Sequence, residues 1–263
     1  MMKKSNVIKR SAILSMVLIG LFASANLFAQ EIELFTKVRA NNIDAVKTLI
    51  AAGADVNQED DMMGFTPLAL AIWNNNSEIV QLLISNKANI NYRSKKRGLT
   101  PLMEALNLNH IDLAKLLIDR GADINIKSND GSTALIFAAG RSKEAVELLL
   151  SKGADINVRN NNNLGVFTNC VMGLFVGYVS YDLAELLLEK GADINEENTN
   201  EYMAGETPIF LVAGEDNEEL IKFLIKNGAN VNAKSKEGKT PLSIATEAGN
   251  ANIIELLKAS GAK

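Results

Sequence analysis

The stretch Gly121-Ala-Asp-Ile-Asn125 decides the fold, because versions of it return at a nearly constant spacing. The first version is Gly53-Ala-Asp-Val-Asn57, and successive versions begin 34, 34, 32, 38, 37 and 33 residues apart. The others are Lys87-Ala-Asn-Ile-Asn91, Gly153-Ala-Asp-Ile-Asn157, Gly191-Ala-Asp-Ile-Asn195, Gly228-Ala-Asn-Val-Asn232 and the final Gly261-Ala262. Self-similarity at such a period is typical of proteins built from stacked repeats.

A second phrase runs in step with the first. It reads Thr66-Pro67-Leu68 and returns as Thr100-Pro101-Leu102, Thr133-Ala134-Leu135, Thr207-Pro208-Ile209 and Thr240-Pro241-Leu242. Thr predicts the N-cap of a helix, because its hydroxyl can accept a hydrogen bond from a free backbone N–H, and Pro suits the first helical turn. A small residue follows each Thr by five positions and is expected to face the core: Ala71, Ala105, Ala138 and Ala245.

A second helix is predicted after a break rich in Asn or Gly. Its apolar stripe, for example Ile79, Val80 and Leu83, has helical spacing. The Gly of the first phrase supplies the left-handed residue that ends this helix, and the Asp and Asn beyond it favour a turn. Two helices of about ten residues each are unstable alone in water, so each pair must stack on the next.

The two phrases resemble the ankyrin repeat, over nearly all of residues 31–263. The resemblance implies an all-α solenoid of about seven helix-turn-helix repeats joined by loops or hairpins, in one domain from residue 30 to residue 263. The predicted repeats are approximately 31–57, 58–91, 92–125, 126–157, 158–195, 196–232 and 233–263. The first and last are expected to differ from the others, because each has one face in water.

The fifth repeat departs most from the pattern. Thr168-Asn169-Cys170 stands where Thr-Pro-Leu is expected, and Gly173 stands where the small core residue is expected. Its helix break, residues 177–182, is about two residues longer than the others. We therefore place Cys170 at the core Leu position and interpret it as a buried small hydrophobe rather than a reactive thiol.

Residues 1–29 have the features of a signal peptide: basic residues up to Arg10, an apolar run from Ala12 to Ala23, and then small residues. We predict cleavage after Ala29, with cleavage after Ala25 or an uncleaved membrane anchor as alternatives. The mature chain would be periplasmic or secreted. It would carry 23 basic and 31 acidic residues, a net charge of −8, which disfavours nucleic acid and anionic membranes as partners.

Residues that commonly perform catalysis or bind metals are scarce. The only histidine is His110, at the place where the resemblance puts Gly-His before a second helix, and the only cysteine is Cys170. A nucleophile–base pair or a usual zinc site needs more such residues, and no disulfide can form within the chain. The recurring Asp-x-Asn lacks the Gly and terminal Glu of a calcium loop, so we interpret it as a turn. We predict no enzyme activity, no cofactor and no bound metal.

The resemblance also implies that loop tips and the outward face of the first helices line a concave groove that binds a protein partner. Many side chains expected in this groove are apolar, which is typical of interaction sites, although a neighbouring loop could bury them instead. The candidate residues are Met62, Met63, Phe65, Trp73, Asn74, Lys96, Arg97, Leu99, Asn107, Leu108, Phe167 and Phe175, together with Leu164 and Val176.

The function expected from these features is that of an exported, non-enzymatic module for protein–protein interaction. Two versions stay open: an adaptor that supports an envelope or stress protein, and an immunity or inhibitor protein that neutralises a toxin or enzyme. Two further classes are an enzyme or enzyme subunit with a site at the fifth repeat, and a structural spacer without a specific ligand.

Overall fold

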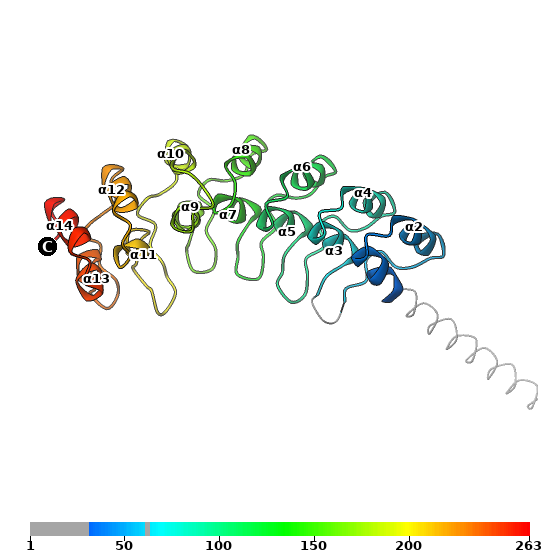
Figure 1. Cartoon of the computed structure of the whole chain (residues 1–263), viewed down its shortest axis with the longest axis horizontal. Helices are drawn as coiled ribbons and strands as arrows, with labels where there is room; N and C mark the ends of the chain where they lie inside the picture. Colours follow the sequence, from blue (N-terminus) through cyan, green and yellow to red (C-terminus); the bar gives the residue numbers. More distant parts are fainter. Residues whose placement is uncertain (1–31, 61–63) are drawn as a thin grey trace, which may run out of the picture. The chain divides into compact units, whose positions relative to one another are not determined.

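The structure is a computed structural model that describes residues 32–60 and 64–263. All regular secondary structure in these residues is helical, which confirms the expected all-α fold. A helical segment covers residues 32–39. The helices that follow are α2 (Ile43–Ala51), α3 (Pro67–Trp73), α4 (Ser77–Ser85), α5 (Pro101–Asn107), α6 (Ile111–Asp119), α7 (Ala134–Ala139), α8 (Lys143–Ser151), α9 (Val166–Phe175), α10 (Tyr181–Glu189), α11 (Phe210–Ala213), α12 (Glu218–Lys226), α13 (Pro241–Ala248) and α14 (Ala251–Ala259) (Figure 1).

The described residues divide into two compact units, of which the first ends at Asn89 and the second is Ile90–Lys263. In each repeat, the earlier helix of the pair is called the first helix and the later one the second helix. The N-terminal unit contains the segment 32–39 and α3 as first helices, and α2 and α4 as second helices. In the C-terminal unit, α5, α7, α9, α11 and α13 form one row and α6, α8, α10, α12 and α14 form another (Figure 1). The long loops project on the side of the first helices (Figure 1).

Three of the five predicted Thr caps form as expected. The Thr66 hydroxyl accepts a hydrogen bond from the backbone N–H of Ala69, and Thr100 and Thr240 cap α5 and α13 in the same way. Thr133 is the N-cap residue of α7, as predicted, but the expected hydrogen bond to its side chain is absent. The prediction is wrong for Thr207, because residues 207–209 form a turn ahead of the short α11 and the Thr207 hydroxyl is buried without a hydrogen-bond partner.

The second helices begin and end as the sequence predicts. The side chains of Asn42, Asn76 and Asn217 cap α2, α4 and α12 by accepting a backbone N–H. After the second helix of each repeat the backbone turns left-handed, with φ of +91° at Gly121. Glycine adopts this conformation without a steric penalty, and Lys87, with φ of +69°, takes the same place after α4.

The Asp and Asn of the repeat phrase form a turn and also link neighbouring repeats. The Asp55 carboxylate accepts from the backbone N–H of Asn57 at 2.8 Å, which confirms the predicted turn. The Asn57 side chain then accepts from Asn89 N at 2.7 Å and donates to the Lys87 carbonyl at 3.3 Å. Similar pairs of bonds are made by Asn195, to Gly228 and Asn230, and by Asn232, to Gly261 and Lys263.

The core lies between successive helix pairs within each unit. The small residues five positions after Thr are all buried, as expected: Ala71, Ala105, Ala138 and Ala245. Because these side chains are small, adjacent first helices can pack closely, and α7 packs against both α5 and α9. No helix in residues 32–60 or 64–263 combines the length and the apolar character that a membrane crossing requires.

Helix α9 in the fifth repeat begins one turn earlier than predicted. It has ten residues, whereas α3 and α5 have seven, and its N-cap is Gly165 instead of Thr168. Cys170 is therefore five residues after the cap, which is the small core position, and Phe167 takes the Leu position. Our placement of Cys170 at the Leu position is wrong, while its predicted burial is confirmed. Gly173 is buried as expected, but its predicted place at the small core position is wrong, because Cys170 takes that position.

Candidate interaction surface

The large apolar side chains that remain exposed are confined to first helices and loops. They are Ile32, Trp73, Met172, Phe175, Val176, Tyr178, Tyr202, Met203 and Leu211. Within the described residues, the second helices contribute none. Large apolar patches on a water-facing surface mark interaction sites. We call the exposed side chains of the first helices and the adjoining loops the first-helix face of each unit, and consider it the candidate interaction surface.

Trp73 is the accessible aromatic residue of the first-helix face in the N-terminal unit. It is the last residue of α3 and is 47% exposed. Its indole lies on the ring of Phe65, with 5.5 Å between ring centroids and 47° between ring planes. Phe65 is only 7% exposed, so its predicted exposure is wrong: the residue directly before the Thr cap turns inward, and Trp73 covers it. Phe65 supports Trp73.

Asn74 also has a structural contact. Its side-chain amide donates to the Val38 carbonyl at 2.9 Å and to the Arg39 carbonyl at 3.3 Å, which ties α3 to the helical segment 32–39. The predicted groove residues Met62 and Met63 lie outside the described residues.

The third repeat presents fewer accessible apolar groups than predicted. Leu99 is buried, so its predicted exposure is wrong for the same reason as that of Phe65: it directly precedes the Thr cap of α5. Lys96 and Arg97 are exposed, whereas Asn107 and Leu108 are half-buried. The Arg97 Nη1 lies 3.0 Å from the Glu104 Oε1.

Glu104 is a buried carboxyl group in the first turn of α5. Its Oε2 atom has no hydrogen-bond partner, so Arg97 compensates only one of its two oxygens. Burial raises the pKa of Glu104, and the nearby Arg97 charge opposes this effect.

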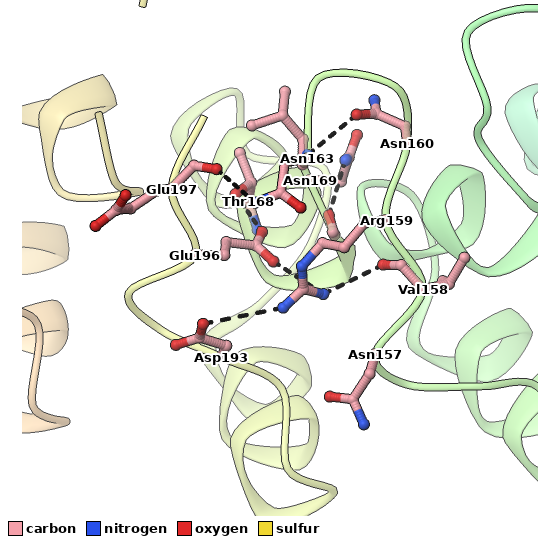
Figure 2. A network of polar contacts seen from close by, with 12 residues as sticks. Asn157, Val158, Arg159, Asn160, Asn163, Thr168, Asn169, Asp193, Glu196 and Glu197 are labelled. Atoms are coloured by element: carbon pink, nitrogen blue, oxygen red, sulfur yellow. Dashed lines mark hydrogen bonds and ion pairs between the residues drawn. The ribbon is translucent and has the colours of Figure 1, made fainter. Parts of the chain in front are cut away.

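The extra turn of α9 is capped by a residue from the next repeat, Glu196 (Figure 2). The Glu196 Oε1 accepts from Thr168 N at 2.6 Å and also from the Thr168 hydroxyl. Thr168 is the third residue of α9, and this N–H is the one that Thr66 satisfies in α3. Gly165 at the N-cap has no side chain to accept it, so Glu196 replaces the missing cap.

Arg159 compensates the charge of Glu196. The Arg159 Nη1 lies 3.3 Å from the Glu196 Oε2 and donates to the Val158 carbonyl, while its Nη2 lies 4.0 Å from Asp193 (Figure 2). Burial raises the pKa of Glu196, and the hydrogen bonds from Thr168 and the Arg159 charge oppose this effect. A Cβ at Gly165 would collide with both Arg159 and Glu196. A larger residue at the cap would therefore require the Arg159 and Glu196 side chains to shift.

This extra turn also decides which fifth-repeat aromatics are accessible. Phe167 is completely buried, so its predicted exposure is wrong: the turn places it at the core Leu position. Phe175, the last residue of α9, and Val176 after it are exposed, and Leu164 is half-buried.

A pocket of about 340 Å³ lies between the C-terminal ends of α5, α7 and α9. Above the Tyr178 ring, the Arg141 guanidinium carbon is 4.5 Å from the ring centroid. Two predicted groove residues, Asn107 and Val176, meet in this pocket. Its lining residues are Asn107, Phe137, Gly140, Arg141, Asn169, Met172, Gly173, Val176 and Tyr178.

Sequence analysis missed Arg141, Met172 and Tyr178. Arg141 and Tyr178 belong to the breaks between helices, where no repeat phrase indicates which way a side chain points. The longer break of the fifth repeat, which contains Tyr178, is the one signal that could have drawn attention to this place.

Two residues were considered for chemistry: Cys170 is buried in the core, and His110 lies at the start of a helix. Burial raises the pKa of Cys170 to about 12, so the thiol stays protonated near neutral pH. His110 is the N-cap residue of α6, at the start of a second helix as predicted. Across the part of the chain that the structure describes, no three His, Cys, Asp or Glu side chains lie close enough together to hold a metal ion.

Comparison with known proteins supports the repeat architecture. A family model described as ankyrin repeats (3 copies) matches residues 34–128, 92–160 and 174–263. Rabankyrin-5 from Homo sapiens is 43% identical over 53 residues, which are 20% of this chain and 4% of that protein. Rabankyrin-5 from Mus musculus matches with the same identity and coverage. The chain therefore covers only a small part of these relatives.

Proposed function

Because the chain belongs to the ankyrin-repeat family, we propose that it is an exported, non-enzymatic module that binds a protein partner through its first-helix face. Ankyrin repeats indicate a protein–protein interaction module. Beyond this general role, we propose that the chain is exported, that it binds through the first-helix face and that it catalyses no reaction.

The observation that carries the proposal is the one-sided distribution of exposed apolar residues. Trp73 and Phe175 are each the last residue of a first helix, and both are exposed. Tyr178 and Arg141 add the residue types that are enriched at binding hot spots. The second helices of the described residues, in contrast, have no large apolar side chain as exposed as these, and their least covered ones are half-buried. A surface of this kind is expected to lose its contact with water when a partner binds.

The proposal of export is supported by the basic and apolar segments of residues 1–29. N-terminal sequencing of the protein recovered from its native envelope or medium tests it. Gln30 is the expected first residue, whereas Asn26 would indicate cleavage after Ala25. An intact N-terminus on protein that stays with the membrane would support the anchor, and recovery in the cytoplasm alone would contradict export.

An enzyme site at the fifth repeat is the competing possibility. Its nucleophile would be Cys170, which is buried and holds its proton near neutral pH. Thr168, the nearest hydroxyl in the sequence, is buried and donates to Glu196. Neither group is accessible to a substrate, which supports the non-enzymatic proposal.

Affinity capture tests the proposed surface. The tagged full chain is used to recover partners from the native envelope, and the Trp73→Ala/Phe175→Ala double variant is compared with the original. Its matched control is Gln81→Ala/Glu185→Ala, which changes two exposed residues of the second helices α4 and α10. We expect the first double variant to lose at least about tenfold in partner recovery and the control to lose none.

Equal recovery by all three proteins, or loss only in the second-helix control, would show that the partner uses another surface. Thermal unfolding of each variant is measured alongside, because both target side chains are half exposed and should be replaceable without unfolding the chain. The identity of the recovered protein then separates the adaptor role from the immunity role.

A further inference from the structure

The pocket between α5, α7 and α9 exists because a side chain is missing at its base. Gly140 is the seventh residue after Thr133, as Trp73 is after Thr66 and Asn107 is after Thr100. A Cβ at Gly140 would lie 3.0 Å from the Asn169 carbonyl, and one at Gly173 would lie 2.8 Å from the Gly140 carbonyl. The two glycines let α7 and α9 approach closely and leave backbone as the floor of the pocket.

The walls above this floor are apolar and accessible. Met172 and Val176 line one side, and Val176 is 56% exposed. Phe137 and Tyr178 add aromatic surface. Burial of such surface by a ligand is favourable because it removes apolar area from water. The pocket therefore suits an apolar side chain of a partner.

Arg141 at the same pocket indicates the charge of that partner. Its guanidinium is held over the Tyr178 ring and forms no ion pair with any carboxylate of the described residues. Arg97 and Arg159, in contrast, each pair with a buried glutamate of the chain itself. A guanidinium has five N–H donors in a planar arrangement that matches a carboxylate, and stacking on an aromatic ring leaves these edge donors available.

Asn107 adds a polar group that is suited to binding a polypeptide. Within the described residues, the half-buried Asn107 side chain makes no hydrogen bond. Its amide can therefore donate to and accept from the backbone of a partner. A carboxylate near Arg141, an apolar group near Met172 and a peptide unit near Asn107 together describe an acidic, apolar protein segment.

We propose that this pocket is a docking site for a partner segment in which an apolar residue is adjacent to an Asp or Glu. The apolar side chain fills the space above Gly140 and Gly173, and the side-chain carboxylate pairs with Arg141. This inference rests on the proposed function as a protein-binding module, and adds the chemistry of the partner and the place of recognition. The chain as a whole is acidic, so the positive charge of Arg141 is a local attraction for an acidic side chain. This single charged contact also orients the partner segment in the pocket.

A selection from a random dodecapeptide display library against the full chain tests this docking site. The chain is compared with Arg141→Glu and with the matched control Arg120→Glu, which makes the same charge change at an exposed position after the second helix α6. We expect the original and the control to select peptides with Asp or Glu next to Leu, Phe or another apolar residue. Arg141→Glu should lose this preference and favour Lys or Arg instead.

Synthetic versions of the leading peptide then locate the charge. Replacing its acidic residue with the uncharged amide should weaken binding to the original chain by about tenfold, and should not weaken binding to Arg141→Glu. Met172→Ala should also weaken binding of the unchanged peptide. Amidation of the peptide C-terminus should have no effect, because the proposal assigns the carboxylate to a side chain.

Absence of an acidic preference, or the same preference in Arg141→Glu, would overturn the inference, as would binding that needs only a free C-terminal carboxylate. These outcomes are independent of the affinity capture described above. Partner recovery that depends on Trp73 and Phe175 but not on Arg141 would leave the proposed function intact and contradict the docking site. Arg141-dependent peptides without any recovered partner would support the pocket and contradict the wider proposal.

Discussion

At the scale of single residues, burial separates groups that the sequence places in the same class. Phe65 and Trp73 are both aromatic residues of the second repeat, and both were expected in the groove. Phe65 is 7% exposed and Trp73 is 47% exposed, so the first belongs to the core and the second is available to a partner. The tilted contact between the two rings connects the roles, since Phe65 holds Trp73 in position.

Replacing each of these aromatics with alanine should have different effects on stability. Phe65→Ala is expected to cost about 3–5 kcal/mol, the range for buried aromatic residues, whereas Trp73→Ala should cost about 1 kcal/mol because half of its surface is already in water. Urea unfolding followed by circular dichroism measures both. Equal losses would contradict the assignment of Phe65 to the core and Trp73 to the surface.

Glu104 should make stability depend on pH in a definite direction. Burial raises its pKa in the folded state above the ordinary value of 4.5, so its contribution to stability is fully present below that pH. The contribution is lost as pH rises through the raised pKa, because the buried group must then ionise. In the variant Glu104→Gln, which keeps an acceptor for Arg97, this loss cannot occur.

The free energy of unfolding of Glu104→Gln relative to the original chain should therefore increase between pH 4 and pH 7. Chemical unfolding at several pH values measures this difference. Glu255→Gln, at an exposed position of α14, controls for the change in net charge. A difference that stays constant or decreases with pH would contradict the predicted direction.

At the scale of elements, the same repeat phrase leads to different helix boundaries. Helices α3, α5 and α13 start at the residue after their Thr, because the Thr side chain satisfies the free N–H of the first turn. Helix α9 starts three residues before the position that Thr168 predicts, because Glu196 satisfies that N–H from another repeat. The cap therefore decides where the helix begins, whichever part of the chain supplies it.

The cap of α9 should be sensitive to the size of its N-cap residue. Gly165→Ala would place a Cβ against Arg159 and Glu196, so we expect it to destabilise the chain by about 1–3 kcal/mol through overpacking. Gly214→Ala is the matched control, since Gly214 also has an ordinary negative φ and its Cβ would meet the Ile244 side chain at 3.3 Å.

We expect the control to change stability by no more than about 0.5 kcal/mol. The measurement is the urea midpoint of both variants. A Gly165→Ala protein as stable as Gly214→Ala would mean that the Glu196 network can move aside, and that it does not hold the extra turn rigidly.

At the scale of the whole molecule, stability comes from contacts between neighbouring repeats. Helices α11 and α12 pack against α13 and α14, respectively, and the Asn232 side chain bonds to Gly261 and Lys263. Contacts of this kind connect each repeat only to those beside it, which makes the stability of a stack close to a sum of local terms.

Removal of the last repeat, residues 233–263, should leave the remaining repeats folded. We expect a lower melting temperature and a smaller dependence of unfolding on urea, because less surface is buried. Circular dichroism of the shortened chain measures both. A second deletion, of residues 196–263, should continue the trend. Loss of all helical signal after the first deletion would contradict additive stacking.

The sequence by itself determined the repeat period, the pairing of helices, the Thr caps of α3, α5 and α13 and the left-handed helix ends. All of these depend on residues within a few positions of one another, so their pattern is visible along the chain. Exposure and the start of α9 were decided only by the tertiary structure. Phe65, Leu99 and Phe167 are covered by side chains or turns that no local phrase indicates.

The same reason explains why the sequence did not indicate the pocket. Asn107 and Val176 lie 69 positions apart in the chain and line the same pocket because α7 packs against both α5 and α9. Arg141 and Tyr178 belong to helix breaks, where the sequence sets no direction for a side chain. Packing of the helices brings these residues together and forms a pocket with Arg141 at its rim.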